Sequence, residues 1–81
     1  MKLSELGKGE SAKVIKIATD IEMKKRLVDL GINSGSIIKL ERNAPLGDPQ
    51  EFRINMNSFA IRKIDAEKII VEKLLEEEKN V

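Results

Sequence analysis

IIKLERNAPLGDPQEFRINMNSFAIRK, residues 37–63, is the stretch that decides the fold class. Apolar and polar side chains alternate over residues 37–42 and again over residues 51–56, as they do on strands that bury one face. We expect Phe52, Ile54 and Met56 to point inward. Asn57-Ser58 is then expected to turn the chain into a further strand that begins at Phe59, giving a hairpin.

The segment between the first two of these strands is predicted to be a rigid loop. Its two prolines fix φ and remove backbone donors, so a partner that binds it loses little conformational entropy. Leu46 lies between the prolines and is expected either to be an exposed apolar anchor or to pack back on the domain. The candidate partner-binding residues of this loop are Ala44, Pro45, Leu46, Gly47, Asp48 and Pro49.

A strand and a helix are predicted before residues 37–63. Residues 11–17 are rich in β-branched side chains and roughly alternate, which favours a strand. Met23, Leu27 and Leu30 recur at helical spacing, and Gly31 follows directly where a left-handed residue can end a helix. The helix therefore lies between the first two strands.

After residue 63 the sequence predicts one helical turn over residues 65–68, capped by Asp65, and a last strand over residues 69–72 that can close the sheet. Five short strands, one amphipathic helix and sharp turns predict a mainly β fold, a small barrel with short helical turns. We expect one domain over residues 1–73 and an acidic C-terminal tail over residues 74–81.

Composition excludes several classes of function. The 81 residues include no cysteine and no histidine, which excludes disulfides, tetrahedral zinc sites and a Ser-His-Asp triad. No stretch approaches the ~20 apolar residues of a membrane span, and the N-terminus lacks a signal-peptide pattern. A net charge of +1 suits a protein partner better than a nucleic acid. We therefore expect a cytoplasmic protein that reaches a membrane only through a partner.

The predicted helix is the second candidate binding surface, through Lys24, Lys25, Arg26, Leu27 and Leu30. Its leucines also fit the core or a lid of the barrel, and its basic side chains also fit a solvated face. Toward an acidic partner this cluster would raise the association rate more than the affinity.

No catalytic, cofactor or metal residue is predicted. The carboxylates at Asp20, Glu22, Asp48 and residues 76–78 show no spacing that would bring them together around Fe(II). Residues 7–11 contain two glycines and a lysine but lack the spacing of a phosphate-binding loop. These charges are interpreted as solvated, and the glycines as a turn.

Several segments, in their order along the chain, resemble the FeoA family of ferrous iron transport proteins. They are Leu3-Ser4-Glu5-Leu6, Gly7-Lys8-Gly9, Leu27-Val28-Asp29-Leu30-Gly31-Ile32, Ser34-Gly35, Ala44-Pro45-Leu46-Gly47-Asp48-Pro49 and Ala60-Ile61-Arg62-Lys63. The resemblance covers nearly the whole chain except the acidic tail. Where the family often has glycine and an aromatic at the hairpin, this chain has Met56-Asn57, which predicts a wider or bulged hairpin.

The resemblance implies an SH3-like barrel and a non-catalytic accessory role in ferrous iron uptake. Its implied partner is the cytosolic part of FeoB, the GTP-dependent iron transporter, which would recruit the chain to the inner face of the membrane. The family label of transition metal ion binding comes with it, and no cofactor is implied. A relative of this domain also forms part of iron-dependent repressors, so a free-standing regulatory role is an alternative.

A small barrel that binds nucleic acid is a further alternative. It would present Lys24, Lys25, Arg26, Arg62 and Lys63 to phosphates. Two phenylalanines are the only aromatic residues, and both occupy apolar strand positions, so platforms for base stacking are missing. A protein partner is therefore the better reading.

Overall fold

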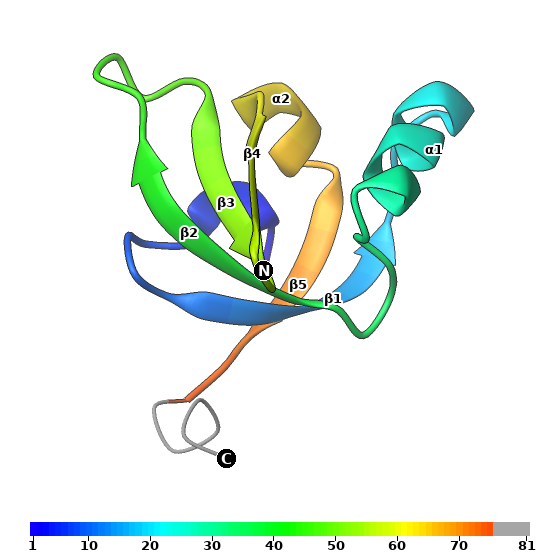
Figure 1. The fold of residues 1–81 in the computed structure, drawn as a ribbon, viewed down its shortest axis with the longest axis horizontal. Coiled ribbons are helices and arrows are strands. Elements are labelled where there is room, and N and C mark those ends of the chain that lie inside the picture. The colour runs from blue at the N-terminus through cyan, green and yellow to red at the C-terminus, as the bar shows by residue number, and fades with distance from the viewer. Residues whose placement is uncertain (76–81) are drawn as a thin grey trace.

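The computed structural model describes residues 1–75 of the chain. A five-stranded antiparallel sheet forms the body of the protein, in the order β4-β3-β2-β1-β5 (Figure 1). The strands are β1 (Ser11–Ile17), β2 (Ile37–Asn43), β3 (Gln50–Ile54), β4 (Asn57–Ile61) and β5 (Ile69–Lys73). The helices are a 3-10 turn η1 (Leu3–Glu5), α1 (Ile21–Asp29) and α2 (Lys63–Ala66). The mainly β fold with one long helix between the first two strands is confirmed.

One face of the curved sheet forms the core. The alternation in β2 and β3 buries Ile38, Leu40, Phe52 and Ile54, while their neighbours face solvent. Burying such a side chain contributes about 1.5–3 kcal/mol, and this small chain needs a contribution from every element. Within residues 1–75 the buried core consists of Leu3, Leu6, Ala12, Val14, Leu27, Ile32, Ile38, Leu40, Phe52, Ile54, Ile61, Ala66, Ile69 and Val71.

The helix α1 is capped at its start and is followed by the predicted glycine. The Asp20 carboxylate accepts a hydrogen bond of 2.8 Å from the backbone N–H of Met23 and so caps the first turn. Gly31, with φ of 91°, adopts the left-handed conformation after the last turn. Leu27 faces the core, and α1 stands beyond the end of β1 at one side of the sheet (Figure 1).

The β3–β4 hairpin differs from the prediction. Ile54 pairs with Asn57, so Asn55 and Met56 form a two-residue loop, and the ladder continues from there without a bulge. Asn55 has φ of 54°, a conformation that asparagine tolerates better than most residues. Met56 is 87% exposed. The predictions of an inward Met56, a turn at Asn57-Ser58 and a wider hairpin are therefore wrong, because the alternating pattern continues through Met56, two residues past the end of β3.

The cap of α2 also differs from the prediction. Asp65 lies inside the helix, and its carboxylate pairs with the Arg62 guanidinium at 3.1 Å. The Asp48 carboxylate instead accepts a hydrogen bond of 3.0 Å from the backbone N–H of Lys63, at the first residue of α2. The helix begins two residues earlier than expected because this distant loop residue satisfies its first donor.

The two outer strands do not meet. No ladder joins β4 to β5 within residues 1–75, and α2 spans the gap between them (Figure 1). The N-terminus covers part of the β5 edge, because Lys2 bridges to Ile70 and the Met1 ammonium donates to the Val71 carbonyl at 3.0 Å. The prediction that the last strand closes the sheet is therefore wrong in detail: among the five strands of residues 1–75, β5 forms a ladder with β1 and none with β4.

Candidate functional site

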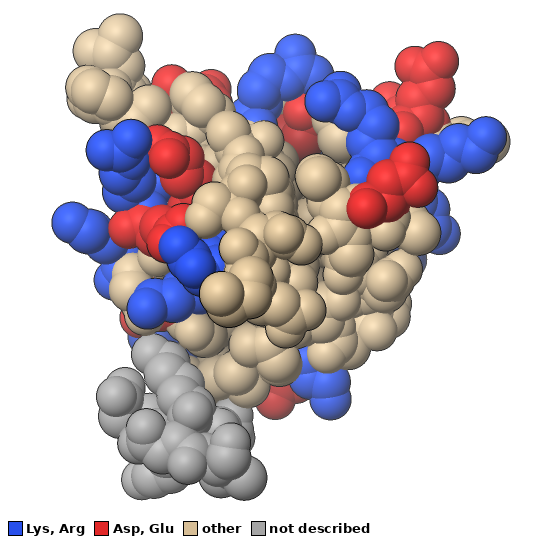
Figure 2. Space-filling view, viewed as in Figure 1, with Lys and Arg blue, Asp and Glu red and all other residues tan. Residues whose placement is uncertain are grey.

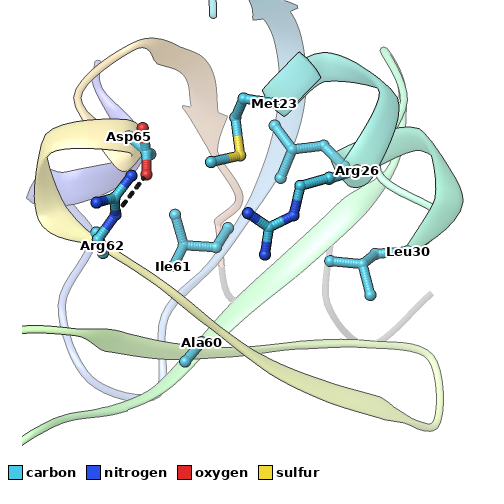
Figure 3. A pocket seen from close by; sticks show the side chains of 8 residues that line it. Met23, Arg26, Leu30, Ala60, Ile61, Arg62 and Asp65 are labelled. Atoms are coloured by element: carbon cyan, nitrogen blue, oxygen red, sulfur yellow. Dashed lines mark hydrogen bonds and ion pairs between the residues drawn. The ribbon is translucent and has the colours of Figure 1, made fainter.

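A cleft of about 320 Å³ opens between α1 and the end of β4 (Figure 3). Its volume lies at the small end of the range for binding clefts in proteins. Both walls consist of residues that the fold brings together from distant parts of the sequence. The lining residues are Met23, Arg26 and Leu27 from α1 with Leu30 directly after it, Ala60 and Ile61 from β4, and Arg62 and Asp65 around the start of α2.

Helical spacing creates the α1 wall. Met23, Leu27 and Leu30 fall three and four residues apart, so they share one face of the helix. Leu27 is 1% exposed and belongs to the core, whereas Leu30, at the end of the helix, is 40% exposed. The α1 wall is therefore buried at Leu27 and forms an apolar, solvent-exposed surface at Leu30.

Positive charge borders the cleft. Arg62 forms an ion pair with Asp65 at 3.1 Å, and that arginine side chain is 70% exposed. Arg26 extends from α1 toward Ile61 (Figure 3), and within residues 1–75 no carboxylate lies in ion-pair range of it. The cleft thus has two guanidiniums and one carboxylate along its border. A ligand with an apolar group and an adjacent negative charge would suit it.

The loop between β2 and β3 forms a second, separate surface. The Ala44 N–H donates to the Pro49 carbonyl at 2.9 Å, the Gly47 N–H donates to the Ala44 carbonyl at 2.7 Å, and the Asp48–Pro49 peptide bond is cis. Leu46 is 97% exposed at the tip, so it does not pack back on the domain. The loop presents an ordered backbone with one fully exposed apolar side chain.

The residues proposed from the sequence do not form one patch. Arg26, Leu27 and Leu30 line the cleft, whereas Lys24 and Lys25 lie on the other side of α1 beside Ile21, Val28 and Asp29. The loop Ala44–Pro49 projects on the side of the molecule away from α1, where Figure 2 shows its tip uncharged. Figure 2 also shows an uncharged band over the middle of this face, between charged side chains over β2 and β3 and others over α1.

The β4 wall is the part of the site that the sequence did not reveal. Ala60 and Ile61 follow the pattern of a strand, and nothing in their spacing connects them to a helix about thirty residues earlier. As a binding residue, the sequence suggests Arg62 for a phosphate contact and not for a cleft. The pairing of a helix face with an edge strand depends on the tertiary fold, for which the local sequence carries no signal.

Glu41, a charged residue whose pKa is shifted, lies outside the cleft. A hydrogen bond from Ser58 and another from Arg53 lower the pKa of Glu41 below its ordinary value. These three residues join β2, β3 and β4 on the outer face of the sheet, at 2.9 Å and 3.0 Å. Within residues 1–75 no three acidic side chains gather as metal ligands would, and no helix is long and apolar enough to cross a bilayer.

Known proteins share both sequence and fold with this chain. The FeoA domain model matches residues 1–73. A protein of Porphyromonas gingivalis, described as a fusion of Fe(2+) transport protein A and the Fe(2+) transporter FeoB, is 36% identical over 72 residues. The match covers 89% of this chain and 8% of that relative's length.

Solved FeoA structures have the same fold. The FeoA protein of Chlorobium tepidum is 43% identical with a TM-score of 0.89, over 93% of this chain and 71% of that one. FeoA of Stenotrophomonas maltophilia, solved with zinc, is 28% identical with a TM-score of 0.74, and 89% of each chain is covered. That protein is described as a prokaryotic SH3 domain protein and a candidate activating factor of ferrous iron transport.

The family match over residues 1–73 includes all five strands and α1, and therefore both walls of the cleft. These likenesses confirm the SH3-like fold expected from the sequence and link the chain to ferrous iron transport. With the domain model matched from Met1 through the end of β5, this chain belongs to the FeoA family.

Proposed function

We propose that the chain is a non-catalytic accessory protein of ferrous iron uptake that binds the cytosolic part of a FeoB-type transporter. One observation carries the proposal: in the Porphyromonas gingivalis relative, the FeoA and FeoB parts form a single polypeptide. Covalent linkage holds two modules at a high effective concentration. Association that does not depend on covalent linkage needs a contact surface on the FeoA part.

The cleft between α1 and β4 is the surface best suited to that contact. Leu30 leaves apolar area open to solvent beside the half-buried Met23, and burying such area on a partner is favourable. The loop Ala44–Pro49 supplies a second contact through Leu46, and its ordered backbone lowers the entropic cost of binding. Lys24 and Lys25, on the far side of α1, act through charge during approach.

Such a protein modulates its transporter by contact alone. A surface that binds one conformational state of FeoB more tightly than another shifts the population toward that state. The proposal needs no bound cofactor and no reaction on this chain. It places the chain in the cytoplasm, recruited to the inner face of the membrane by its partner.

The test measures binding of the full chain to full-length FeoB from the same organism, in detergent, with and without guanine nucleotide. Leu30→Asp alters the cleft, and Val28→Asp is its matched control. The two side chains are 40% and 44% exposed, and they lie two residues apart at the C-terminal end of α1, so the added acid costs the helix a similar amount.

We expect saturable binding that Leu30→Asp weakens about tenfold or more, which corresponds to about 1.4 kcal/mol, while Val28→Asp stays close to wild type. Absence of saturable binding in every nucleotide state would overturn the proposed function. Equal weakening by both variants would leave the function standing and remove the cleft as its site.

A further inference from the structure

The free edge of β4 borders the cleft. β4 is an edge strand of the sheet, so within residues 1–75 it is paired only on the side that faces β3. The cleft is lined from α1, β4 and α2, and no lining residue comes from β3. Figure 3 shows the stretch from Ala60 to Arg62 opposite the side chains of α1. The unpaired sheet edge and the cleft therefore form one continuous surface.

The hairpin register identifies the backbone groups on this edge. Ile54 and Asn57 flank a two-residue loop, so they are a hydrogen-bonded pair, and such pairs alternate along the ladder. On β4, Phe59 is the next residue to bond to β3. The N–H and C=O groups of Ser58 and Ala60 therefore point away from β3, and within residues 1–75 no hydrogen bond engages them.

The edge is short, and α2 ends it. The Arg62 carbonyl accepts hydrogen bonds from the N–H groups of Asp65 and Ala66 at 2.9 Å and 3.0 Å, so it is not available to an added strand. Within β4 itself, the outward groups are the N–H and C=O of Ser58 and the N–H and C=O of Ala60. An edge of this length accepts one short extended segment and gives little opportunity for sheet-to-sheet aggregation.

The cleft determines which side chain such a segment would carry. A strand added beside Ser58 and Ala60 would place alternate side chains toward the space next to Leu30. The lining is mixed: Met23, Leu30 and Ile61 give it apolar surface against which an apolar anchor fits, and charged side chains border that surface. Arg26 borders the same space without an ion-pair partner in residues 1–75, so a carboxylate next to the anchor would be stabilised.

We propose that β4 receives an extended segment of the FeoB-type transporter as an added sixth strand, with an apolar side chain in the cleft and an adjacent acidic residue at Arg26. This inference rests on the proposed function and specifies its binding mode. Main-chain hydrogen bonds to Ser58 and Ala60 supply affinity, and the cleft supplies specificity for the anchor.

Hydrogen–deuterium exchange of the full chain, alone and bound to full-length FeoB, tests the binding mode. Mass spectrometry with fragmentation that resolves single amides reports on Ser58 and Ala60. Both amides are expected to exchange fast in the free protein and to slow at least tenfold in the complex, because each gains a hydrogen bond. The Phe59 amide, already bonded to β3, serves as the internal reference.

The outcomes separate the two proposals. Binding to FeoB with Ser58 and Ala60 still in fast exchange would overturn strand addition and leave the accessory function in place. Absence of binding would overturn both. Slow exchange of these amides in the isolated chain, lost on dilution, would show that a second copy occupies the edge, and would overturn the assignment to the transporter.

A proline supplies an independent test. Ala60→Pro removes the outward N–H of residue 60. An edge strand tolerates proline at such a position because no hydrogen bond of the ladder is lost. Ala60→Val keeps the N–H and adds similar bulk. We expect Ala60→Pro to bind FeoB about tenfold more weakly than Ala60→Val, with similar thermal midpoints for the two variants. Equal affinities would contradict strand addition.

Discussion

The Asp48 carboxylate in the β2–β3 loop accepts a 3.0 Å hydrogen bond from the backbone N–H of Lys63, at the start of α2. One side chain therefore holds the loop against the helix that spans the gap between β4 and β5. Its negative charge also lies at the positive end of that short helix. Arg62 occupies the N-cap position of α2, but its side chain makes no capping hydrogen bond, so the loop residue Asp48 takes that role.

Asp48→Ala is predicted to lower the free energy of unfolding by about 1 kcal/mol, the usual cost of losing a helix cap. In a domain of this size that corresponds to a fall of about 4–8 °C in the thermal midpoint. Urea unfolding followed by circular dichroism measures it. Asp29→Ala, which removes an exposed carboxylate with no hydrogen bond in the described structure, is the control. An equal loss in the two variants would contradict the capping role.

The hairpin register gives a second prediction. Ile54 is 4% exposed and Met56 is 87% exposed, although both are apolar and two residues apart. Ile54→Ala is therefore expected to cost about 3 kcal/mol, whereas Met56→Ser should change stability by less than about 0.5 kcal/mol. Chemical unfolding of both variants decides the matter. A large loss in Met56→Ser would restore the inward methionine that the alternating pattern predicts.

These two sites show what the sequence could and could not predict. The strands β1 and β2 and the end of α1 were predicted because their signals are local: side-chain alternation, helical spacing and a glycine after the last turn. Met56 was misplaced because an apolar residue in a two-residue loop continues the pattern of the strand before it. The cap by Asp48 was missed because its partner lies fifteen residues away in sequence.

The sequence predicts the helix face that forms one wall of the cleft, but it does not predict the cleft itself. Leu27 and Leu30 were selected for helical spacing, which is sufficient to define one face of α1. The opposite wall at Ala60 depends on where the sheet ends, and that position follows from pairing between strands rather than from local sequence. The exposure of Leu46 was left open between two alternatives, because the sequence shows a rigid loop but not its direction.

The pH dependence of the outer face gives a third prediction. Hydrogen bonds from Ser58 and then Arg53 lower the pKa of Glu41 in the folded state below its ordinary value of 4.5. A lowered pKa means that the contribution to stability is complete above the unfolded-state pKa and disappears as pH falls through the folded-state value. Acid below about pH 4.5 therefore weakens this link between β2, β3 and β4.

Carboxyl carbon NMR titration of Glu41 checks that direction. Ser58→Ala is expected to raise the Glu41 pKa, because it removes the largest stabilising hydrogen bond to the ionised form. Asn57→Ala, one residue earlier on β4 and with no hydrogen bond to Glu41 in the described structure, should leave that pKa unchanged. A Glu41 pKa that does not respond to Ser58→Ala would contradict the assigned cause.

The end of α1 gives a fourth prediction. Gly31 has φ of 91°, and a Cβ built there meets no atom within 4 Å, so the cost of a side chain is conformational rather than steric crowding. Gly31→Ala should lower the free energy of unfolding by about 1–2 kcal/mol, and Gly31→Asn by less, since asparagine visits this region more readily. Urea unfolding of the pair tests the order. Equal losses would show that the glycine is needed for another reason.

The loop surface gives the last prediction, and it separates binding from folding. Leu46 is 97% exposed, so its side chain contributes almost nothing to the stability of the folded state. The free energy of unfolding of Leu46→Ser should equal that of wild type within about 0.5 kcal/mol.

If the loop contacts FeoB as proposed, the same variant should weaken binding several-fold, because truncating an apolar anchor that becomes buried at an interface costs on the order of 1 kcal/mol or more. Calorimetry with full-length FeoB measures the affinity. The control is Met56→Ser, which changes an apolar side chain that is 87% exposed at the tip of the β3–β4 hairpin. Because the loop and the cleft lie on different sides of the molecule, the losses from Leu46→Ser and Leu30→Asp should add in the double variant. Wild-type affinity in Leu46→Ser would confine the contact to the cleft and the edge of β4.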